Sequence, residues 1–281
     1  MNETPDVVNV ADALRVAAAR LAESSDTARL DAEVLMAHLL GVSRSDLLLR
    51  RMSEPAPEGF AALVERRAGH EPVAYIVGSQ EFYGRTFEVT PDVLIPRADS
   101  ETTLEAALEA APDAGRVLDC GVGSGALLLS FLAERPRASG VGLDRSPGAL
   151  AVAARNAAAT GVAERCLLVE GDWTGAGWSD GLGAFDLVIA NPPYVETSAE
   201  LDADVRDFEP AGALFAGPEG LDDYRVLIPQ LPALLAPGGK AVLEIGAAQA
   251  GAVSALAAAA GFTAVLRKDL AGRPRSLVLS I

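Results

Sequence analysis

Short apolar runs alternate with helix-like segments from residue 97 to residue 281, and this pattern restricts the possible folds more than any other feature of the sequence. The expected strands lie at 116–120, 138–143, 166–170, 185–190, 240–245, near 262–268 and at 276–281. The expected helices lie at 98–111, 125–134, 147–160, 221–236 and 248–260. Such alternation predicts an α/β fold with a mostly parallel sheet and helices on both faces. The last two strands follow each other closely enough to pair antiparallel.

The N-terminal part of the chain has a helical pattern instead. Apolar residues recur at three- and four-residue spacing in 11–22, 29–41 and 59–69, and Ser43 is placed to cap a short helix. Residues 73–96 carry β-branched and aromatic side chains with two glycine breaks, which predicts a β-hairpin joining two bodies. We therefore expect a helical domain at 1–72, a β-hairpin linker at 73–96 and an α/β domain at 97–281.

The charge of the chain limits its partners. The net charge is −16 with only two lysines, so the protein as a whole repels a phosphate backbone, and direct nucleic-acid binding is not expected. The two cysteines have no metal-ligand spacing and give no disulfide framework, which fits a reducing cytosol and predicts no metal site. The N-terminus lacks an apolar signal core, and no segment reaches the roughly 18 apolar residues of a membrane span. We expect a cytoplasmic monomer without a membrane segment.

A glycine-rich turn follows the first strand of the α/β part, in RVLDCGVGSGALLL at 116–129. Glycines bring the backbone close to a ligand at the start of the next helix. The turn is expected to bind a cofactor through Gly121, Val122, Gly123, Ser124 and Gly125. Such a motif is weak when it stands alone, and the alternative is a tight strand–helix turn without a ligand.

Acidic residues end the next two strands. Asp144 is placed to accept the two hydroxyls of a ribose, although it also precedes a helix and would serve as its N-cap. Asp172 and Trp173 end the third strand, where a carboxylate and an indole suit the amino group and ring of adenine. The alternative for Trp173 is ordinary packing. Together with the glycine turn, these strand ends fit NAD or S-adenosylmethionine.

The fourth strand, FDLVIA at 185–190, ends in the stiff sequence Asn191-Pro192-Pro193-Tyr194. Two prolines end the strand and fix the turn. This turn suits transfer of a methyl group to a planar amide or aromatic amine, whose nitrogen lone pair is delocalised. The Asn191 side-chain oxygen and the Pro192 carbonyl each accept one N–H of that nitrogen, and Tyr194 stacks on the planar group. The chemistry depends on positioning and needs no strong base.

Further motifs accompany NPPY after the fourth strand: LDAEVLMAHLLG in the helical part, EFYGRTFEVTPDVLIPRADSE at 81–101, GDW at 171–173 and PGGKAVLEIG at 237–246. Together these motifs resemble the release factor glutamine methyltransferases, the family also called HemK or PrmC. The resemblance covers nearly the whole chain. It implies a seven-stranded, Rossmann-like, S-adenosylmethionine-dependent methyltransferase domain, an N-terminal helical domain and a connecting hairpin. Because a protein substrate needs a second contact surface, we expect the helical domain to recognise the substrate.

The resemblance also implies a reaction and roles for residues. The reaction is methylation of the N5 side-chain nitrogen of the glutamine in the Gly-Gly-Gln motif of bacterial class 1 peptide chain release factors. The glycine turn, Asp144, Asp172, Trp173 and Asn191 would bind S-adenosylmethionine. Asn191, Pro192, Pro193 and Tyr194 would bind the glutamine, and Asn191, Pro192 and Tyr194 would act in catalysis.

Other functions stay open from the sequence. A nucleic-acid adenine N6-methyltransferase uses the same NPPY chemistry, but it needs a basic groove or a target-recognition insert. An NAD-dependent oxidoreductase needs an acid–base residue near the nicotinamide, and only Tyr194 is a candidate. A protein that binds S-adenosylmethionine without turnover, or a turn that merely ends a strand, would not need the intact Asn191.

Overall fold

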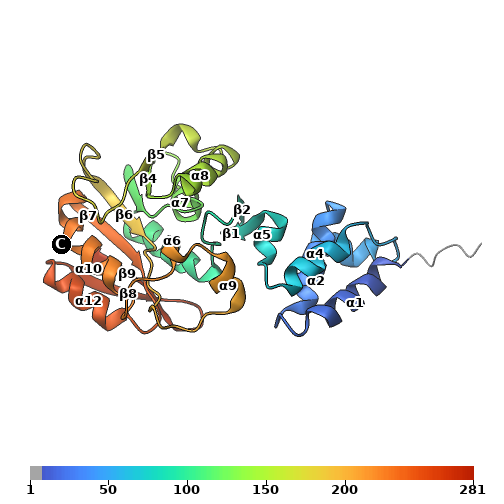
Figure 1. Cartoon of the computed structure of the whole chain (residues 1–281). Helices are drawn as coiled ribbons and strands as arrows, with labels where there is room; N and C mark the ends of the chain where they lie inside the picture. The colour runs from blue at the N-terminus through green and yellow to red at the C-terminus, as the bar shows by residue number, and fades with distance from the viewer. Residues whose placement is uncertain (1–7) are drawn as a thin grey trace, which may run out of the picture. The chain divides into compact units, whose positions relative to one another are not determined.

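The computed structural model describes residues 8–281, and their contacts divide them into two units (Figure 1). The smaller unit comprises the described residues up to Gly78 together with Leu201–Phe208. The larger unit comprises Ser79–Glu200 and Glu209–Ile281. Among the described residues, none of the helices has both the length and the apolar character to cross a membrane.

The smaller unit is helical, as its apolar spacing predicts. Its helices are α1 (Val10–Leu21), α2 (Ala28–Leu40), α3 (Arg44–Asp46), a π-helical turn (Leu47–Arg51), α4 (Phe60–Ala68), α5 (Val73–Val77) and α9 (Ala203–Phe208). The Ser43 hydroxyl accepts the Asp46 N–H at 3.0 Å and caps α3, as expected. Helices α1, α2, α4 and α5 and the π-helical turn contribute to one apolar core, which includes Leu14, Leu35, Met36 and Phe60, whereas α3 and α9 bury no side chain in it.

Helix α9 was not expected from the sequence, and a buried ion pair explains why it belongs to the smaller unit. Arg67 on α4 is only 7% exposed, and its guanidinium lies 2.7 Å from Asp31 on α2. The same guanidinium lies 3.6 Å from Asp204 on α9. A buried charge needs such partners, so this arginine ties the segment 201–208 to helices far away in the sequence.

The hairpin expected over 73–96 is shorter than expected. Its strands are β1 (Ser79–Phe82) and β2 (Arg85–Glu88), which pair antiparallel. Residues Val73–Val77 form α5 instead, because Pro72 is placed to begin a helix and Gly78, with φ of +76°, ends it. In the turn between the strands, Tyr83 and Gly84 both have positive φ, at 51° and 69°, as a tight two-residue hairpin requires.

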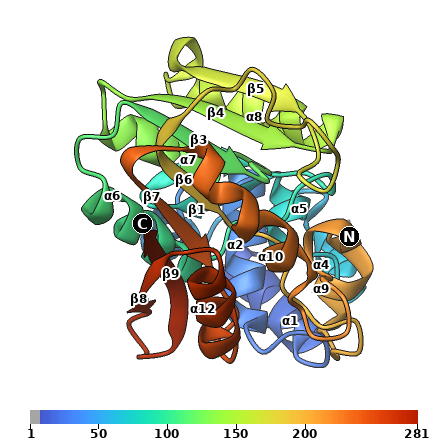
Figure 2. The same ribbon diagram turned by 90° about the vertical axis from the view of Figure 1, so that its left-hand side faces the viewer.

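The larger unit is built on a seven-stranded sheet, whose strands are labelled in Figure 2. Its order is β5 (Cys166–Glu170), β4 (Ser139–Asp144), β3 (Arg116–Cys120), β6 (Phe185–Ala190), β7 (Leu235–Glu244), β9 (Pro274–Ser280) and β8 (Thr263–Lys268). All neighbours are parallel except for the pairs that β9 forms with β7 and β8. The predicted α/β architecture and the antiparallel final pair are confirmed.

Helices cover both faces of the sheet. Helices α6 (Glu101–Ala110), α7 (Ala126–Glu134) and α8 (Pro147–Ala159) contribute Leu104, Leu128 and Ala153 to one apolar core. Helices α10 (Asp222–Leu227), α11 (Leu231–Leu234) and α12 (Ala250–Ala259) contribute to a second core, with Leu227, Leu231 and Val253. Burial of these side chains from water holds the three layers together.

One expected helix is interrupted. The segment 221–236 forms α10, a 3-10 turn at Ile228–Gln230 and the short α11, and β7 already begins at Leu235. Pro229 and Pro232 explain the break, since a proline has no N–H to donate to the preceding helical turn.

Candidate functional site

The carboxyl ends of four parallel strands meet at one edge of the sheet. The chain runs from β3 outward to β4 and β5 and then returns to place β6 on the other side of β3. In register, Cys120 at the end of β3 pairs with Leu143 of β4 and with Ala190 of β6. Ligands of open α/β sheets bind at such a reversal of strand order, just beyond the strand ends.

A cavity lies at this edge. Most of the predicted site residues line it, namely Gly121, Val122, Gly123, Ser124, Asp144, Asp172, Trp173, Asn191 and Pro193. Gly125, Pro192 and Tyr194 are not among the lining residues. The walls also include two segments that were not assigned to the site, 92–97 and 210–213.

The glycine turn between β3 and α7 needs its glycines for two reasons. Gly121, Gly123 and Gly125 have φ of +85°, +52° and +86°, which side chains rarely adopt. Space is also restricted: a Cβ on Gly121 would lie 3.2 Å from the Trp173 ring, and one on Gly125 would lie 2.5 Å from a Leu129 methyl group. The turn is therefore a bare stretch of backbone facing the cavity, and Gly125 serves the entry into α7.

Asp144 at the end of β4 is bonded on both carboxylate oxygens. One accepts the Gly123 N–H at 2.9 Å and the other accepts the Ser146 N–H at 2.9 Å. The N-cap of α8 is Ser146, whose hydroxyl accepts the Ala149 N–H at 3.2 Å. Asp144 is thus not the helix cap; it fixes the glycine turn and faces the cavity.

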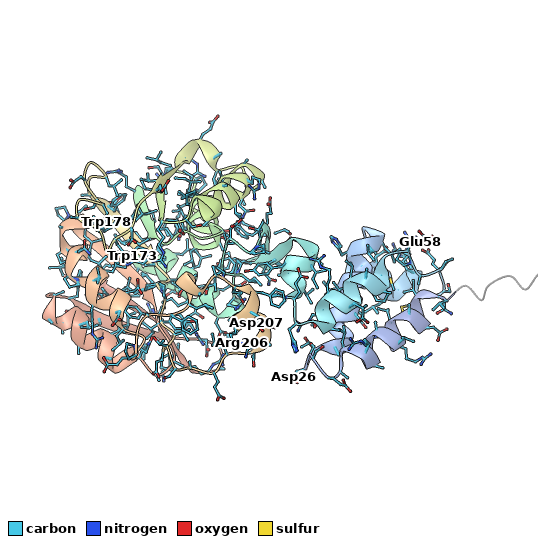
Figure 3. All side chains as sticks on the ribbon, in the orientation of Figure 1. Asp26, Glu58, Trp173, Trp178, Arg206 and Asp207 are labelled. Atoms are coloured by element: carbon cyan, nitrogen blue, oxygen red, sulfur yellow. The ribbon has the colours of Figure 1, made fainter. Side chains whose placement is uncertain are left out.

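Asp172 and Trp173 after β5 are held by different partners. One oxygen of Asp172 accepts the backbone N–H and the hydroxyl of Thr174, at 2.8 and 2.7 Å, and these hydrogen bonds lower the pKa of the carboxyl group. The indole N–H of Trp173 donates to Asp223 at 3.2 Å, while its ring lies against Gly121. Trp173 and Trp178 lie near each other in Figure 3, and Gln230 bonds the carbonyl of the first and the indole of the second.

Asp119 is a site residue that the sequence reasoning missed. It belongs to β3, is 1% exposed and lines the cavity, and its Oδ1 atom has no hydrogen-bond partner among the described residues. Burial raises its pKa to about 7. The available signal was a carboxylate inside an otherwise apolar strand, directly before the glycine turn.

Asn191 follows β6 and lines the cavity. Its side chain is half-buried, and across residues 8–281 the amide forms no hydrogen bond with another residue. The two prolines that follow are buried. An amide that is held on a stiff turn without a protein partner keeps its hydrogen-bonding capacity for a ligand.

Tyr194 does not line the cavity, and its backbone is held by Gln249. Its backbone carbonyl accepts the Gln249 side-chain N–H at 3.0 Å. A Cβ on Gly246 would lie 3.4 Å from the tyrosine ring. Burial raises the pKa of the hydroxyl.

The remaining walls are joined by two arginines that were not predicted. Glu209 is 6% exposed, accepts the Ile95 N–H at 3.1 Å and forms an ion pair with Arg97, which links the segments 92–97 and 210–213. Arg145, next to Asp144, donates to the Gly212 carbonyl at 2.6 Å. A pairing between residues more than a hundred positions apart leaves no local pattern in the sequence.

Comparisons with known proteins agree with this architecture. The family model described as the PrmC N-terminal domain matches residues 12–78, and the model described as the methyltransferase small domain matches residues 98–213. A solved structure of a methyltransferase from Pyrococcus furiosus matches 76% of this chain and 95% of its own, with a TM-score of 0.52 and 17% identity. That likeness supports the fold.

Curated relatives match along the length of the chain. The release factor glutamine methyltransferase of Cereibacter sphaeroides is 46% identical over 275 residues, which cover 95% of this chain and 97% of the relative. The protein of the same name from Geobacter sulfurreducens is 42% identical over 271 residues, with 93% of each chain covered. The protein is a methyltransferase, and it belongs to the release factor glutamine methyltransferase family.

Proposed function

We propose that this protein transfers a methyl group from S-adenosylmethionine to the N5 side-chain nitrogen of the glutamine in the Gly-Gly-Gln motif of class 1 peptide chain release factors. One observation carries the proposal: the Asn191 amide, on its proline-stiffened turn, faces a cavity that is also lined by a bare glycine turn. The family to which the chain belongs supports the choice of substrate.

The residues at the ends of β3, β4 and β5 fit S-adenosylmethionine. The buried Asp119 has an unsatisfied oxygen at the cavity, which suits the α-ammonium group of the methionine part. Asp144 is placed for the ribose hydroxyls, and the Trp173 ring, with Asp172 beside it, is placed for the adenine. When bound, the cofactor supplies a methyl group on a positively charged sulfur.

The Asn191 loop would hold the nitrogen that accepts the methyl group. The Asn191 side-chain oxygen accepts one N–H of the glutamine amide, and the Pro192 carbonyl accepts the other. These two acceptors turn the nitrogen lone pair out of the amide plane and toward the cavity. Pro193, which lines the cavity, would confine the planar amide. Tyr194 does not line the cavity, and its stacking on the amide stays a prediction. The methylated nitrogen loses its extra proton readily, so no strong base is required, and the residues contribute orientation and electrostatics.

We further propose that the helical unit contacts the release factor. A protein substrate offers more surface than one tripeptide, and the helical unit presents exposed apolar side chains, of which Leu49 is 81% exposed. Under this proposal residues 1–72 recognise the substrate, while residues 97–281 bind the cofactor and catalyse transfer. The reaction would take place in the cytoplasm, where peptide release occurs.

The test is methyl transfer from labelled S-adenosylmethionine to three acceptors in parallel. These are a purified class 1 release factor, its variant with alanine in place of the Gly-Gly-Gln glutamine, and unmethylated duplex DNA. Label on the intact release factor alone, lost with Asn191→Ala enzyme, supports the proposal. Label on DNA would instead assign adenine N6-methylation, and label on none of the acceptors would reject both.

A further inference from the structure

Asp223 in the first turn of α10 lines the cavity, although it lies fifty positions after Trp173 in the chain. It is half-buried, and no local motif marks it in the sequence. Its neighbour Asp222 is exposed and does not line the cavity. Asp223 is therefore the aspartate of this helix that is placed to contact a ligand.

The Trp173 ring extends from the glycine turn to Asp223. A Cβ on Gly121 would lie 3.2 Å from Cη2 and 3.3 Å from Cζ3 of the indole, at the outer edge of its six-membered ring. The Nε1–H group, on the five-membered ring at the other end of the indole, donates to the Asp223 Oδ1 atom at 3.2 Å. The backbone of the tryptophan is also fixed, because Gln230 donates to its carbonyl at 3.1 Å. These contacts define the position of both ends of the ring.

An adenine stacked on this ring would be oriented by the ribose attached to it. Asp144, which is placed for the ribose hydroxyls, holds the glycine turn by accepting the Gly123 N–H at 2.9 Å. The ribose end of the base would therefore lie at the glycine turn. The 6-amino group is at the opposite end of the purine from the ribose, so it would reach the Asp223 end of the indole.

The Asp223 carboxylate has an oxygen free for such a group. An ionised carboxylate accepts up to about four hydrogen bonds, and within residues 8–281 the indole N–H is the one hydrogen bond of this side chain. At Asp172, one oxygen already accepts two hydrogen bonds from Thr174. Burial raises the pKa of Asp223, whereas the bonds from Thr174 lower the pKa of Asp172. Asp223 thus lies in the drier surroundings, where a hydrogen bond to an amino group is stronger.

We propose that Asp223 selects adenine in the cofactor site: one carboxylate oxygen holds the Trp173 indole, and the other accepts a hydrogen from the 6-amino group of the base. This inference rests on the proposed use of S-adenosylmethionine. A hypoxanthine base carries a carbonyl oxygen at the same position, and the lone pairs of that oxygen would face the carboxylate. A site that is built to bond an N–H group rejects an analogue that lacks it, because the polar group of the site then stays unpaired.

The test compares the Kd values of two probes, S-adenosylhomocysteine and S-inosylhomocysteine, by calorimetry. The probes differ in the base alone, which carries an amino group in the first and a carbonyl oxygen in the second. The wild type should bind the adenosyl probe about 10- to 100-fold more tightly, since hydrogen bonds to charged groups have effects of this size. Asp223→Asn keeps an oxygen for the indole, but its NH2 group can donate to the inosyl carbonyl. The preference for the adenosyl probe should therefore fall by at least about tenfold in this variant.

Asp222→Asn is the matched control: the same substitution at the neighbouring residue removes a charge that pairs with Arg225 at 3.0 Å outside the cavity. This control should keep the wild-type preference. Asp172→Asn is the competing variant, and loss of the preference there but not in Asp223→Asn would overturn the inference. Equal weakening of both probes in Asp223→Asn would also overturn it, because Asp223 would then only support Trp173.

The binding measurements separate this inference from the proposed function. A preference that depends on Asp223 supports the inference even where the wild type transfers no methyl group to a release factor, a result that would count against the proposed function alone. A wild type that binds the two probes equally, or binds neither of them, would overturn the inference.

Discussion

The two ends of the cavity are built in opposite ways. At the end proposed for the cofactor, the side chains are tied to nearby backbone: both oxygens of Asp144 accept backbone N–H groups, and Asp172 is bonded to Thr174. At the acceptor end, the Asn191 amide has no bond to another described residue, and its loop is held through the Gln249 side chain, which donates to the Tyr194 carbonyl. Asp144 and Asp172 are thus fixed by backbone groups of the turns at the strand ends, whereas the Asn191 loop, like Trp173, is held by a partner that is distant in the sequence.

This difference predicts that the two ends fail separately. A change at the acceptor end should slow the chemical step and spare cofactor binding, because the glycine turn and Asp144 do not depend on Asn191. A change at the cofactor end should weaken cofactor binding first.

The largest effect is expected for Asn191→Ala. Removal of the amide takes away the acceptor that orients the nitrogen, and loss of one such preorganised group typically lowers kcat by about 10²–10³-fold. Cofactor Kd, measured by calorimetry, should rise by no more than a few-fold. A loss of cofactor binding as large as the loss of kcat would break the separation between the two ends.

Asp119→Asn tests the cofactor end. Replacing the carboxylate removes the charge proposed to bind the α-ammonium group, and hydrogen bonds to charged groups are worth about 1.5–3 kcal/mol, so Kd should rise about 10- to 100-fold. At saturating cofactor, kcat should stay within a few-fold of the wild type. An unchanged Kd would show that the unsatisfied oxygen of Asp119 does not meet the cofactor.

The pH dependence of cofactor binding also tests whether the Asp119 carboxylate binds the ammonium group of the cofactor. Burial raises the pKa of Asp119 to about 7 in the free protein, and a bound ammonium group would lower it. Binding then releases a proton below pH 7, so affinity should be full above that value and fall as the pH decreases, by up to about tenfold per unit. Asp119→Asn should flatten the profile in calorimetric titrations between about pH 5.5 and about pH 8, a range that brackets this pKa.

Part of this site could be predicted from the sequence and part could not. The predictable residues belong to local motifs, and the others are held by partners that are distant in the sequence. The glycine turn, Asp144 and the Asn191 loop carry local motifs at strand ends, so the sequence alone is enough to find them. Glu209 and Trp173 are held by partners that are distant in sequence, Arg97 and Asp223, and only the fold brings them together.

The elements follow a similar rule. Six of the seven strands match expectation within two residues because they are short runs between clear breaks, whereas β7 begins at Leu235 instead of residue 240. The helix over Val73–Val77 was missed because its β-branched residues suggested a strand, whereas burial in the helical unit decides its conformation. The division of the chain between substrate recognition at 1–72 and catalysis at 97–281 stays a prediction, as do the individual roles of the site residues.

Glu244→Gln tests a second buried carboxylate, which lies at the end of β7 and is 2% exposed. Burial raises the pKa of Glu244 from 4.5 to about 7, so the folded protein holds this proton more strongly than the unfolded chain between these values. The contribution of this group to stability is therefore present at low pH and falls as the pH rises through that window, by on the order of 1–3 kcal/mol. Urea unfolding at pH 5 and pH 8 should show a smaller loss of stability in Glu244→Gln than in the wild type. Equal losses would place the titration elsewhere.

The smallest effect is expected at the helical unit, which lies outside both ends of the cavity. Leu49 follows the exposed Leu48 in the π-helical turn Leu47–Arg51, and its own side chain is 81% exposed, so aspartate at this position should leave the fold intact. If the unit contacts the release factor, Leu49→Asp should raise KM for that protein a few-fold, with kcat and cofactor Kd unchanged, because a single contact at an interface rim contributes little binding free energy.

Leu270→Asp is the matched control: it introduces the same charge at a fully exposed leucine of the larger unit. Equal KM values for the two variants would argue that this face of the helical unit does not meet the substrate, and a change in kcat would contradict the independence of the helical unit from the chemical step.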